Sequence, residues 1–428
     1  MERRTDHTTR RARTGSTASG EEAEKDRVRT GERMHRSVPD GIWALRKTPV
    51  SPAAEKANEH VVAWARSHGL VRSEAAERRL ASMRTGEFAA RVYPTAGVED
   101  LLLTTDWIAW LDFLDDQNDD RRTALDPEGF EGFLARVADV ASNGVCEGGA
   151  EPIGEAGTGP IGEALTDLWT RTRARAGSRL SRRLHRHLME YLAGNLQQAA
   201  YRRLGHVCDL TEYGALRRAA GGILLTFDLI EIAGGAELPP SVYYSRTYQR
   251  LLTASGDVVC WTNDLLTVEK ETAAGDLLNL VTVLRSAHRS TRSEALARAR
   301  ALVDGRLDDF HRAERDLPGL CAALESDRTR RRALTACADL LRAWMRGHAE
   351  WGVSTGRYSC PPAGPGYLEE LIPDSADAWR TGDARRAEDA RCPEDARRTT
   401  EDARRTEDAR RTTEEARRTE DARRGPDT

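Results

Sequence analysis

The 428-residue chain contains no run of about 18 apolar residues, so no segment predicts a membrane-spanning helix. Its seven cysteines form no CxxC pair, a pattern that favours reduced thiols over a zinc site or a disulfide framework. The first residues, MERRTDHTTRRARTGS, lack the apolar core of a secretory signal. A net charge of −4 gives no general attraction to nucleic acid or to an anionic membrane. These absences predict a cytoplasmic protein that neither binds nucleic acid nor inserts into a membrane.

Alternating apolar and polar residues, which would predict β-strands, are also missing, and helical periodicity appears from about residue 53. The segment VEDLLLTTDWIAWLDFLDD, residues 98–116, is apolar on almost every side, so we expect a helix buried among other helices. The Gly-rich residues 143–163 predict a loop. The sequence therefore predicts an all-α fold of about ten helices.

Composition divides the chain into three parts. Residues 1–44 are rich in Arg, Thr and Ser, which predicts a disordered extension. Residues 45–372 carry the helical pattern and predict a single helical domain. Residues 373–428 end in repeats of EDARRT without an apolar face, so we expect a solvated tail, disordered or partly helical. A partner-binding role is the alternative for this tail.

Carboxylates are concentrated where the apolar segment ends, because WLDFLDDQNDDRR (110–122) carries aspartate at 112, 115, 116, 119 and 120. Asp115 and Asp119 would lie one helical turn apart on one face, with Asp116 beside them. Unpaired carboxylates repel one another, and the C-terminal end of a helix dipole disfavours them further. Mg²⁺ removes this conflict, because it takes carboxylate oxygens together with those of substrate phosphates. A solvated helix end is the alternative.

A second polar stripe lies downstream in NDLLTVEKE, residues 263–271. Asn263, Thr267 and Glu271 are four residues apart, which places an amide oxygen, a hydroxyl and a carboxylate along one helix face. All three are hard oxygen ligands, and Lys270 adds a cation where a phosphate could bind. Next to the apolar GDVVCW run, this stripe is suited to a site at the mouth of a helical bundle.

Together, the two motifs resemble those of the class I terpene synthases, in particular the bacterial terpene cyclases. DDQND resembles the family's Asp-rich motif, and NDLLTVEKE resembles its N-D-x-x-[S/T]-x-x-x-E motif. Arg217 lies 46 residues before Asn263 (263 − 217), at the place of the arginine that senses diphosphate. Arg357 and Tyr358 resemble the family's C-terminal Arg-Tyr pair. The resemblance covers about residues 50–370.

This resemblance implies a class I α-helical bundle that binds three Mg²⁺ ions and a prenyl diphosphate. The implied metal ligands are Asp115, Asp116, Asp119, Asn263, Thr267 and Glu271. The implied diphosphate donors are Arg217, Lys270, Arg357 and Tyr358. The carbonyl of Gly221, beside a Gly pair that can break a helix, would act as effector. A homodimer is a further expectation from the family.

Two positions depart from the family pattern. Ala220 stands where an Asp commonly links the diphosphate sensor to the effector, and Asp112 stands where a Phe often lines the cavity. Asp112 could turn towards metal or solvent, or border the cavity. Trp351 is the strongest candidate for an aromatic cavity wall. Core packing is the stronger alternative for the other candidates, which are Phe88, Trp107, Phe113 and Trp261.

The implied reaction is that of a carbon–oxygen lyase, which ionises a prenyl diphosphate and cyclises the carbocation. Farnesyl diphosphate, the commonest substrate of bacterial members, predicts a sesquiterpene hydrocarbon or alcohol. Geranylgeranyl diphosphate, giving a diterpene, is the alternative. A prenyl diphosphate synthase would need a second DDxxD on the facing helix, and the DxDD of a class II cyclase is absent. A non-catalytic helical binding protein is the least favoured interpretation.

Overall fold

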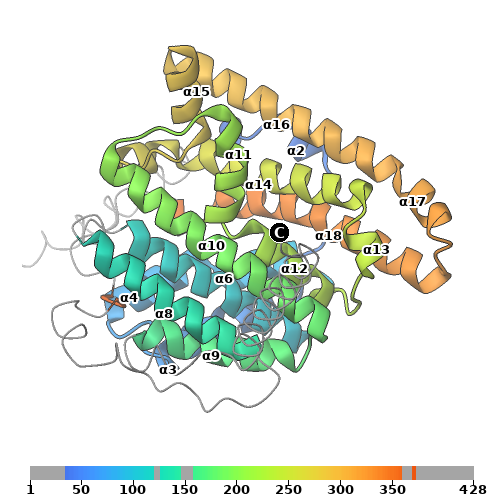
Figure 1. Cartoon of the computed structure of the whole chain (residues 1–428), viewed down its shortest axis with the longest axis horizontal. Helices are drawn as coiled ribbons and strands as arrows, with labels where there is room; N and C mark the ends of the chain where they lie inside the picture. The colour runs from blue at the N-terminus through green and yellow to red at the C-terminus, as the bar shows by residue number, and fades with distance from the viewer. Residues whose placement is uncertain (1–33, 120–125, 146–157, 359–368, 373–428) are drawn as a thin grey trace, which may run out of the picture. The chain divides into compact units, whose positions relative to one another are not determined.

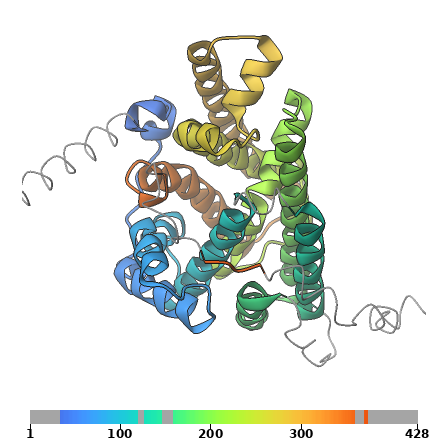
Figure 2. The ribbon, with the colours of Figure 1, turned by 90° about the vertical axis from the view of Figure 1, so that its left-hand side faces the viewer.

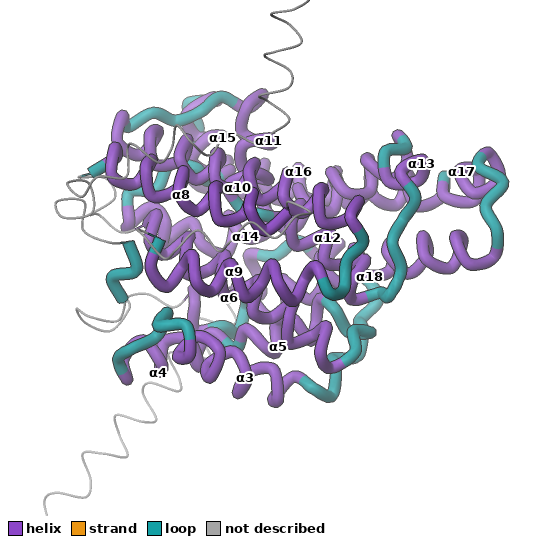
Figure 3. Tube along the Cα trace, turned by 60° about the horizontal axis from the view of Figure 1, so that its bottom comes forward, coloured by secondary structure: helices purple, strands orange, loops and turns teal. Residues whose placement is uncertain are grey.

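The computed structural model describes residues 34–119, 126–145, 158–358 and 369–372, and helices make up all of its regular secondary structure (Figure 1). Figure 3 traces these described residues as helices joined by loops, without a strand. The predicted all-α fold is therefore confirmed. No helix within the described ranges is both long and apolar enough to cross a bilayer.

The first part of the chain forms helices α2 (Asp40–Ala44), α3 (Ala54–Ser67), α4 (Glu74–Met83), α5 (Thr85–Val92), α6 (Val98–Asp119), α8 (Pro127–Val145), α9 (Gly159–Arg173) and α10 (Ser178–Leu204). The second part forms α11 (Leu210–Ala220), α12 (Ile223–Ala233), α13 (Pro240–Tyr243), α14 (Arg246–Ala274), α15 (Leu280–His288), α16 (Arg292–Arg315), α17 (Leu317–Ala323), α18 (Arg328–Gly352) and the 3₁₀ helix η1 (Gly356–Tyr358). The expected number of about ten helices is too low, because several periodic stretches are broken by glycines or end in short separate helices.

Helix α6 is surrounded by other helices, as its apolar sequence predicts. It packs against α3, α5, α9, α10 and α12, and its indole side chains are completely buried. The Nε1 of Trp107 donates to the hydroxyl of Thr172 at 2.9 Å, and the Nε1 of Trp110 donates to the carbonyl of Ile161 at 2.9 Å. Each buried aromatic contributes about 1.5–3 kcal/mol by leaving water. These contacts fix the helix that carries the aspartates.

Residues before position 45 belong to the folded unit, which corrects part of the predicted N-terminal extension. Helix α2 packs against α16 and α18, and Val38 and Ile42 are buried. The ring of His35 stacks on Trp43 with 4.3 Å between centroids, and Arg346 lies over the same indole. The polar composition of residues 1–44 hides this short apolar set. Residues 1–33 lie outside the described part of the chain.

A glycine pair separates α11 from α12. Asp209 caps α11 by accepting hydrogen bonds from the N–H groups of Thr211 and Glu212. The helix ends at Ala220, and Gly222 has φ +60°, a left-handed conformation that glycine adopts without steric cost. The break that the Gly pair predicts is present.

The segment 369–372 lies against the end of α6. Gln117 donates from Nε2 to the carbonyl of Glu369 and accepts from the N–H of Leu371, both at 3.0 Å. The Leu371 side chain is buried. Figure 2 shows this segment as a short orange-red stretch. The predicted tail after residue 372, and most of the predicted loop 143–163, lie outside the described residues.

Candidate active site

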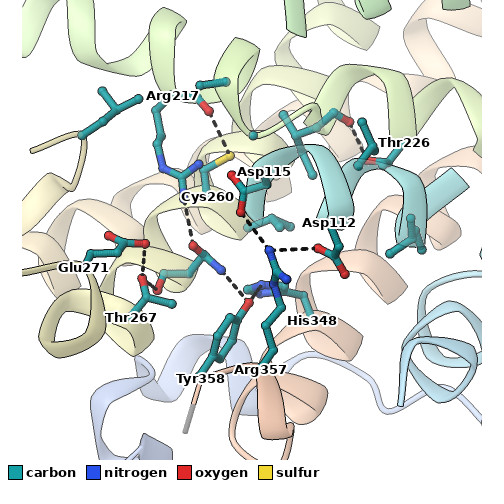
Figure 4. A pocket seen from close by; sticks show the side chains of 18 of the residues that line it. Asp112, Asp115, Arg217, Thr226, Cys260, Thr267, Glu271, His348, Arg357 and Tyr358 are labelled. Carbon is teal, nitrogen blue, oxygen red and sulfur yellow. Dashed lines mark hydrogen bonds and ion pairs between the residues drawn. The ribbon is translucent and has the colours of Figure 1, made fainter. Parts of the chain in front are cut away.

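A cavity that is open to solvent is lined by side chains from α5, α6, α10, α11, α12, α14, α18 and η1 and by Gly221 at the break after α11 (Figure 4). Its lining residues are of two kinds. Charged and polar groups come mainly from α6, α14 and η1, and include Asp112, Asp115, Asn263, Thr267, Lys270, Glu271 and Arg357. Apolar and aromatic groups include Phe88, Ile108, Ile223, Val259, Trp344 and Trp351. The cavity can therefore hold a molecule with an anionic head and an apolar body.

The aspartates on α6 contact Arg357 of the C-terminal Arg-Tyr pair. Arg357 donates from Nη2 to Asp115 at 2.8 Å and from Nη1 to Asp116 at 3.2 Å. Asp116 also accepts from Arg79 at 2.7 Å. Burial disfavours the charged form of Asp116, but the guanidinium groups of Arg357 and Arg79 outweigh it and hold its pKa below the usual range. The side chain of Asp119, the last residue of α6, is outside the described part.

Asp112 borders the cavity, which answers the question left open by the sequence. Its Oδ1 lies 3.3 Å from Nη2 of Arg357, and its buried Oδ2 has no hydrogen-bond partner within the described residues. Burial raises the pKa of Asp112 to about 6, and the Arg357 charge opposes this shift. Arg357 thus faces three carboxylates, and their charges hold its pKa well above the ordinary value although burial opposes this.

The predicted stripe on α14 faces the same cavity. The amide Nδ2 of Asn263 donates to the hydroxyl of Tyr358 at 2.6 Å, which links α14 to η1. The hydroxyl of Thr267 donates to Oε1 of Glu271 at 2.7 Å, and Nδ2 of Asn279 donates to Oε2 of Glu271 at 2.8 Å. Burial raises the pKa of Glu271 to about 7, and two neighbouring carboxylates add to this shift. Asn263, Thr267 and Glu271 therefore lie together on one wall.

Arg217, at the end of α11, lies between the helix break and α14. Its Nε donates to Oδ1 of Asp264 and its Nη2 to Oδ1 of Asn263, both at 2.8 Å. Burial lowers the pKa of Arg217, but the Asp264 charge more than compensates and holds that pKa well above the ordinary value. Gly221 also lines the cavity, and a Cβ at this position would lie 2.9 Å from Nη1 of Arg217. A side chain there would displace the arginine.

The aromatic predictions divide into cavity and core. Phe88 and Trp351 line the cavity and stack with 4.4 Å between ring centroids, and the indole N–H of Trp351 donates to the carbonyl of Met83. Trp107 and Trp261 are buried and do not line this cavity, and Phe113 lines a separate, smaller one. Core packing therefore holds for these three residues.

Several lining residues were not predicted from the sequence. They are Tyr191, Gln198, Asp276, Trp344 and His348. Burial lowers the pKa of His348 to about 3, which keeps this imidazole neutral beside Phe88 and Trp351. Asp264 was missed as the partner of Arg217, although it is the residue after Asn263 in the second motif. The other residues lie on helical stretches without a local polar motif, so the sequence carries no signal for them.

The chemistry of the two walls fits a hard divalent cation. Carboxylate, amide and hydroxyl oxygens are the ligands that Mg²⁺ prefers. Within the described ranges, no three Asp, Glu, His or Cys side chains converge into a ready cage. The donors are divided between α6 and α14, a division that suits metals sharing oxygens with a phosphate group.

Comparison with known proteins identifies the family. The model of terpene synthase family 2, C-terminal metal binding, matches residues 106–309. The (−)-δ-cadinene synthase of Streptomyces clavuligerus is 40% identical over 326 residues, which are 76% of this chain and 96% of that protein. The chain belongs to the bacterial class I terpene synthases.

Two further similarities agree with this membership. The terpene synthase is 31% identical over 310 residues to the farnesyl diphosphate-cyclising (+)-T-muurolol synthase of Roseiflexus castenholzii, covering 72% of this chain and 90% of that protein. A solved structure of a cucumene synthase variant superposes with a TM-score of 0.64 at 30% identity, covering 74% of this chain and 99% of that chain. The terpene synthase is therefore a carbon–oxygen lyase whose family acts on prenyl diphosphates, and the matched metal-binding region implies a divalent metal.

Proposed function

We propose that this terpene synthase uses Mg²⁺ to ionise farnesyl diphosphate and cyclises the carbocation to a sesquiterpene hydrocarbon or alcohol, with release of diphosphate. One observation carries the proposal: the oxygen donors of α6 and α14 and the cations Arg217, Lys270 and Arg357 border one cavity with apolar walls. The cadinene and muurolol synthases described above, the second of which cyclises farnesyl diphosphate, support the C15 chain length.

The metal ligands would come from both walls. Asp115, Asp116 and Asp119 would serve on α6, and the ligands on α14 would be Asn263, Thr267 and Glu271. Three Mg²⁺ ions, as in the family the motifs resemble, would neutralise the charge that develops on the departing diphosphate. Asp115 and Asp116 are held by Arg357 at 2.8 and 3.2 Å, so this guanidinium must exchange carboxylate oxygens for diphosphate oxygens when substrate binds.

The chain's own cations would orient the diphosphate. Arg217, Arg357 and Lys270 border the cavity with the Tyr358 hydroxyl. The planar fork of a guanidinium matches two phosphate oxygens, which fixes the direction in which the carbon–oxygen bond breaks. Gly221 adjoins Arg217, so its carbonyl would lie near the reacting carbon when the arginine grips the diphosphate.

The apolar walls would guide the cation after ionisation. Phe88 packs face to face with Trp351, and its ring meets that of Trp344 edge to face at 5.3 Å. Aromatic faces attract positive charge without reacting with it. The same side chains exclude water, which would otherwise quench the cation before cyclisation. His348 is neutral and so adds no competing positive charge.

The test is to incubate the purified protein with geranyl, farnesyl or geranylgeranyl diphosphate, each with and without Mg²⁺. Products are analysed by gas chromatography–mass spectrometry, and released diphosphate is measured in parallel. We expect a cyclic C15 hydrocarbon or alcohol from farnesyl diphosphate only in the samples that contain Mg²⁺. A cyclic product from geranylgeranyl diphosphate in its place would identify a diterpene synthase. Intact diphosphate in every sample would refute the proposal.

A further inference from the structure

Helix α10 carries a polar stripe that reaches the ends of both predicted metal-binding elements. Asn195, Gln198 and Arg202 are spaced at i, i+3 and i+7, so they share one helix face. Asn195 and Gln198 are buried, and only 12% of the Arg202 side chain is exposed. Buried polar groups of this kind are hydrogen-bonded in native proteins, so the partners of this stripe can be traced.

On one side the stripe holds the end of α6. Arg202 donates from Nη1 to the backbone carbonyl of Asn118 at 2.6 Å, and Nδ2 of Asn118 donates to Oδ1 of Asn195 at 3.0 Å. Carbonyls in the last turn of a helix have no partner within the helix, and a cation there also compensates the helix dipole. Asn118 lies three residues after Asp115, so this contact fixes the turn that carries the aspartates.

On the other side the stripe holds the end of α14. Gln198 donates from Nε2 to Oδ2 of Asp276 at 2.7 Å, and Nη2 of Arg202 lies 3.7 Å from the same oxygen. The N–H of Asp276 donates to the carbonyl of Glu271 at 3.0 Å, which closes α14 after Gly275. An unbroken series of contacts therefore joins Asn118 on α6 to Glu271 on α14.

We propose that Arg202, Gln198 and Asp276 connect the ends of α6 and α14 and so set the distance between the two metal-binding walls; these three residues are called the bracket below. The inference rests on the proposed function, because metals that share one diphosphate require both walls at a fixed distance. Asp276 acts as a positioning residue in this bracket: Oδ2 is engaged by Gln198, and Oδ1 accepts from the N–H of Leu278 at 3.1 Å. Partners that orient metal ligands commonly change metal affinity about 10- to 100-fold when they are replaced.

Two replacements test the bracket independently. Arg202→Gln removes the positive charge and the planar guanidinium group. Gln198→Met removes the amide while keeping the length of the side chain. Arg203→Gln is the matched control, because it removes an exposed charge from the next position of the same helix. Calorimetric titration with inorganic diphosphate at fixed Mg²⁺ measures binding without turnover, and circular dichroism checks the helical content.

We expect both bracket variants to bind Mg²⁺ and diphosphate about 10- to 100-fold more weakly, with unchanged helicity. Arg203→Gln should bind diphosphate like the wild type. Arg202→Lys should recover part of the affinity lost in Arg202→Gln, because lysine keeps the positive charge but lacks the planar guanidinium group. Wild-type affinity in both Arg202→Gln and Gln198→Met would overturn the bracket and leave the proposed function standing. Failure of the wild type itself to bind diphosphate with Mg²⁺ would refute the proposed function.

Discussion

Arg357 lies among three carboxylates, and the proposed function requires this arrangement of charge to change when substrate binds. Its guanidinium faces Asp112, Asp115 and Asp116 at 3.3, 2.8 and 3.2 Å. Hydrogen bonds to charged groups contribute about 1.5–3 kcal/mol each, so removing this cation from the carboxylates without replacement would be costly. In the proposed function, Mg²⁺ would be held by Asp115 and Asp116 and diphosphate by Arg357, so both partners of these ion pairs would be replaced. Asp112, which is not among the proposed metal ligands, would then remain beside Arg357.

Replacing Asn263 tests whether the polar stripe on α14 binds metal. Asn263→Ala removes the amide that contacts both Arg217 and Tyr358 and that is the predicted oxygen ligand. We expect diphosphate release from farnesyl diphosphate to fall on the order of 100-fold or more, because a positioned charge-stabilising group is lost. Circular dichroism should show unchanged helicity. Near-normal turnover in this variant would rule out Asn263 as a ligand.

The raised pKa of Glu271 predicts that metal binding depends on pH. Its pKa is raised by burial from 4.5 to about 7, so below pH 7 the folded protein holds a proton that the unfolded chain loses near pH 4.5. The stability contribution of this group therefore falls as pH rises from about 4.5 to 7, whereas metal affinity rises, because the ligand must be deprotonated. The half-saturating Mg²⁺ concentration, measured from the melting temperature with inorganic diphosphate, should rise up to about tenfold per pH unit below 7. Glu271→Gln should reduce this slope to the part that protonation of diphosphate and Asp112 causes; an unchanged slope would assign it to groups other than Glu271.

At the scale of elements, the helix break after α11 gives a sharp prediction. Gly222 has φ +60°, and an added Cβ would lie 3.1 Å from Tyr191 and 3.3 Å from Leu111. Gly222→Ala should therefore lower stability by about 1–2 kcal/mol through the backbone alone and should displace the break beside Arg217, reducing kcat. Thermal unfolding and steady-state kinetics measure the two effects.

Gly235→Ala is the control for that replacement. Gly235 has φ +68° but open space around its Cβ position, so alanine there carries the backbone strain without crowding. It should lower the melting temperature to a similar extent and leave kcat unchanged. An equal loss of kcat in both variants would mean that the loss comes from reduced stability and not from a displaced helix break.

Local sequence was sufficient to predict the elements that carry the site, because each has a strong short-range signal. The apolar run that predicts a buried helix from residue 98 begins where α6 begins, and the glycine pair at 221–222 marks the break. The contacts between these elements have no local signal. Arg357 and Asp115 are 242 residues apart, and Gln198 and Asp276 are 78 residues apart, so their pairing depends on the packing of the bundle.

At the scale of the whole molecule, polar composition misled the prediction at one end of the domain. Ile42 is fully buried within the short apolar stretch IWAL, which suffices to dock α2 on α16 and α18 although residues 1–44 as a whole are polar. A composition average over residues 1–44 cannot detect so short a segment. At the carboxyl end the predicted domain runs to residue 372 and so includes buried Leu371.

The repetitive tail should therefore be separable from catalysis, whereas the segment before it should not. Deleting residues 383–428 removes EDARRT repeats that have no apolar face, so we expect unchanged kcat and melting temperature. Deleting residues 369–428 also removes buried Leu371 and the backbone groups that pair with Gln117, beside Asp116 on α6. Losing one buried leucine costs about 2–5 kcal/mol, so the longer deletion should lower the melting temperature and, by loosening the aspartate-bearing turn, the affinity for Mg²⁺. A large loss of activity in the shorter deletion would show instead that the repeats themselves contribute to the site.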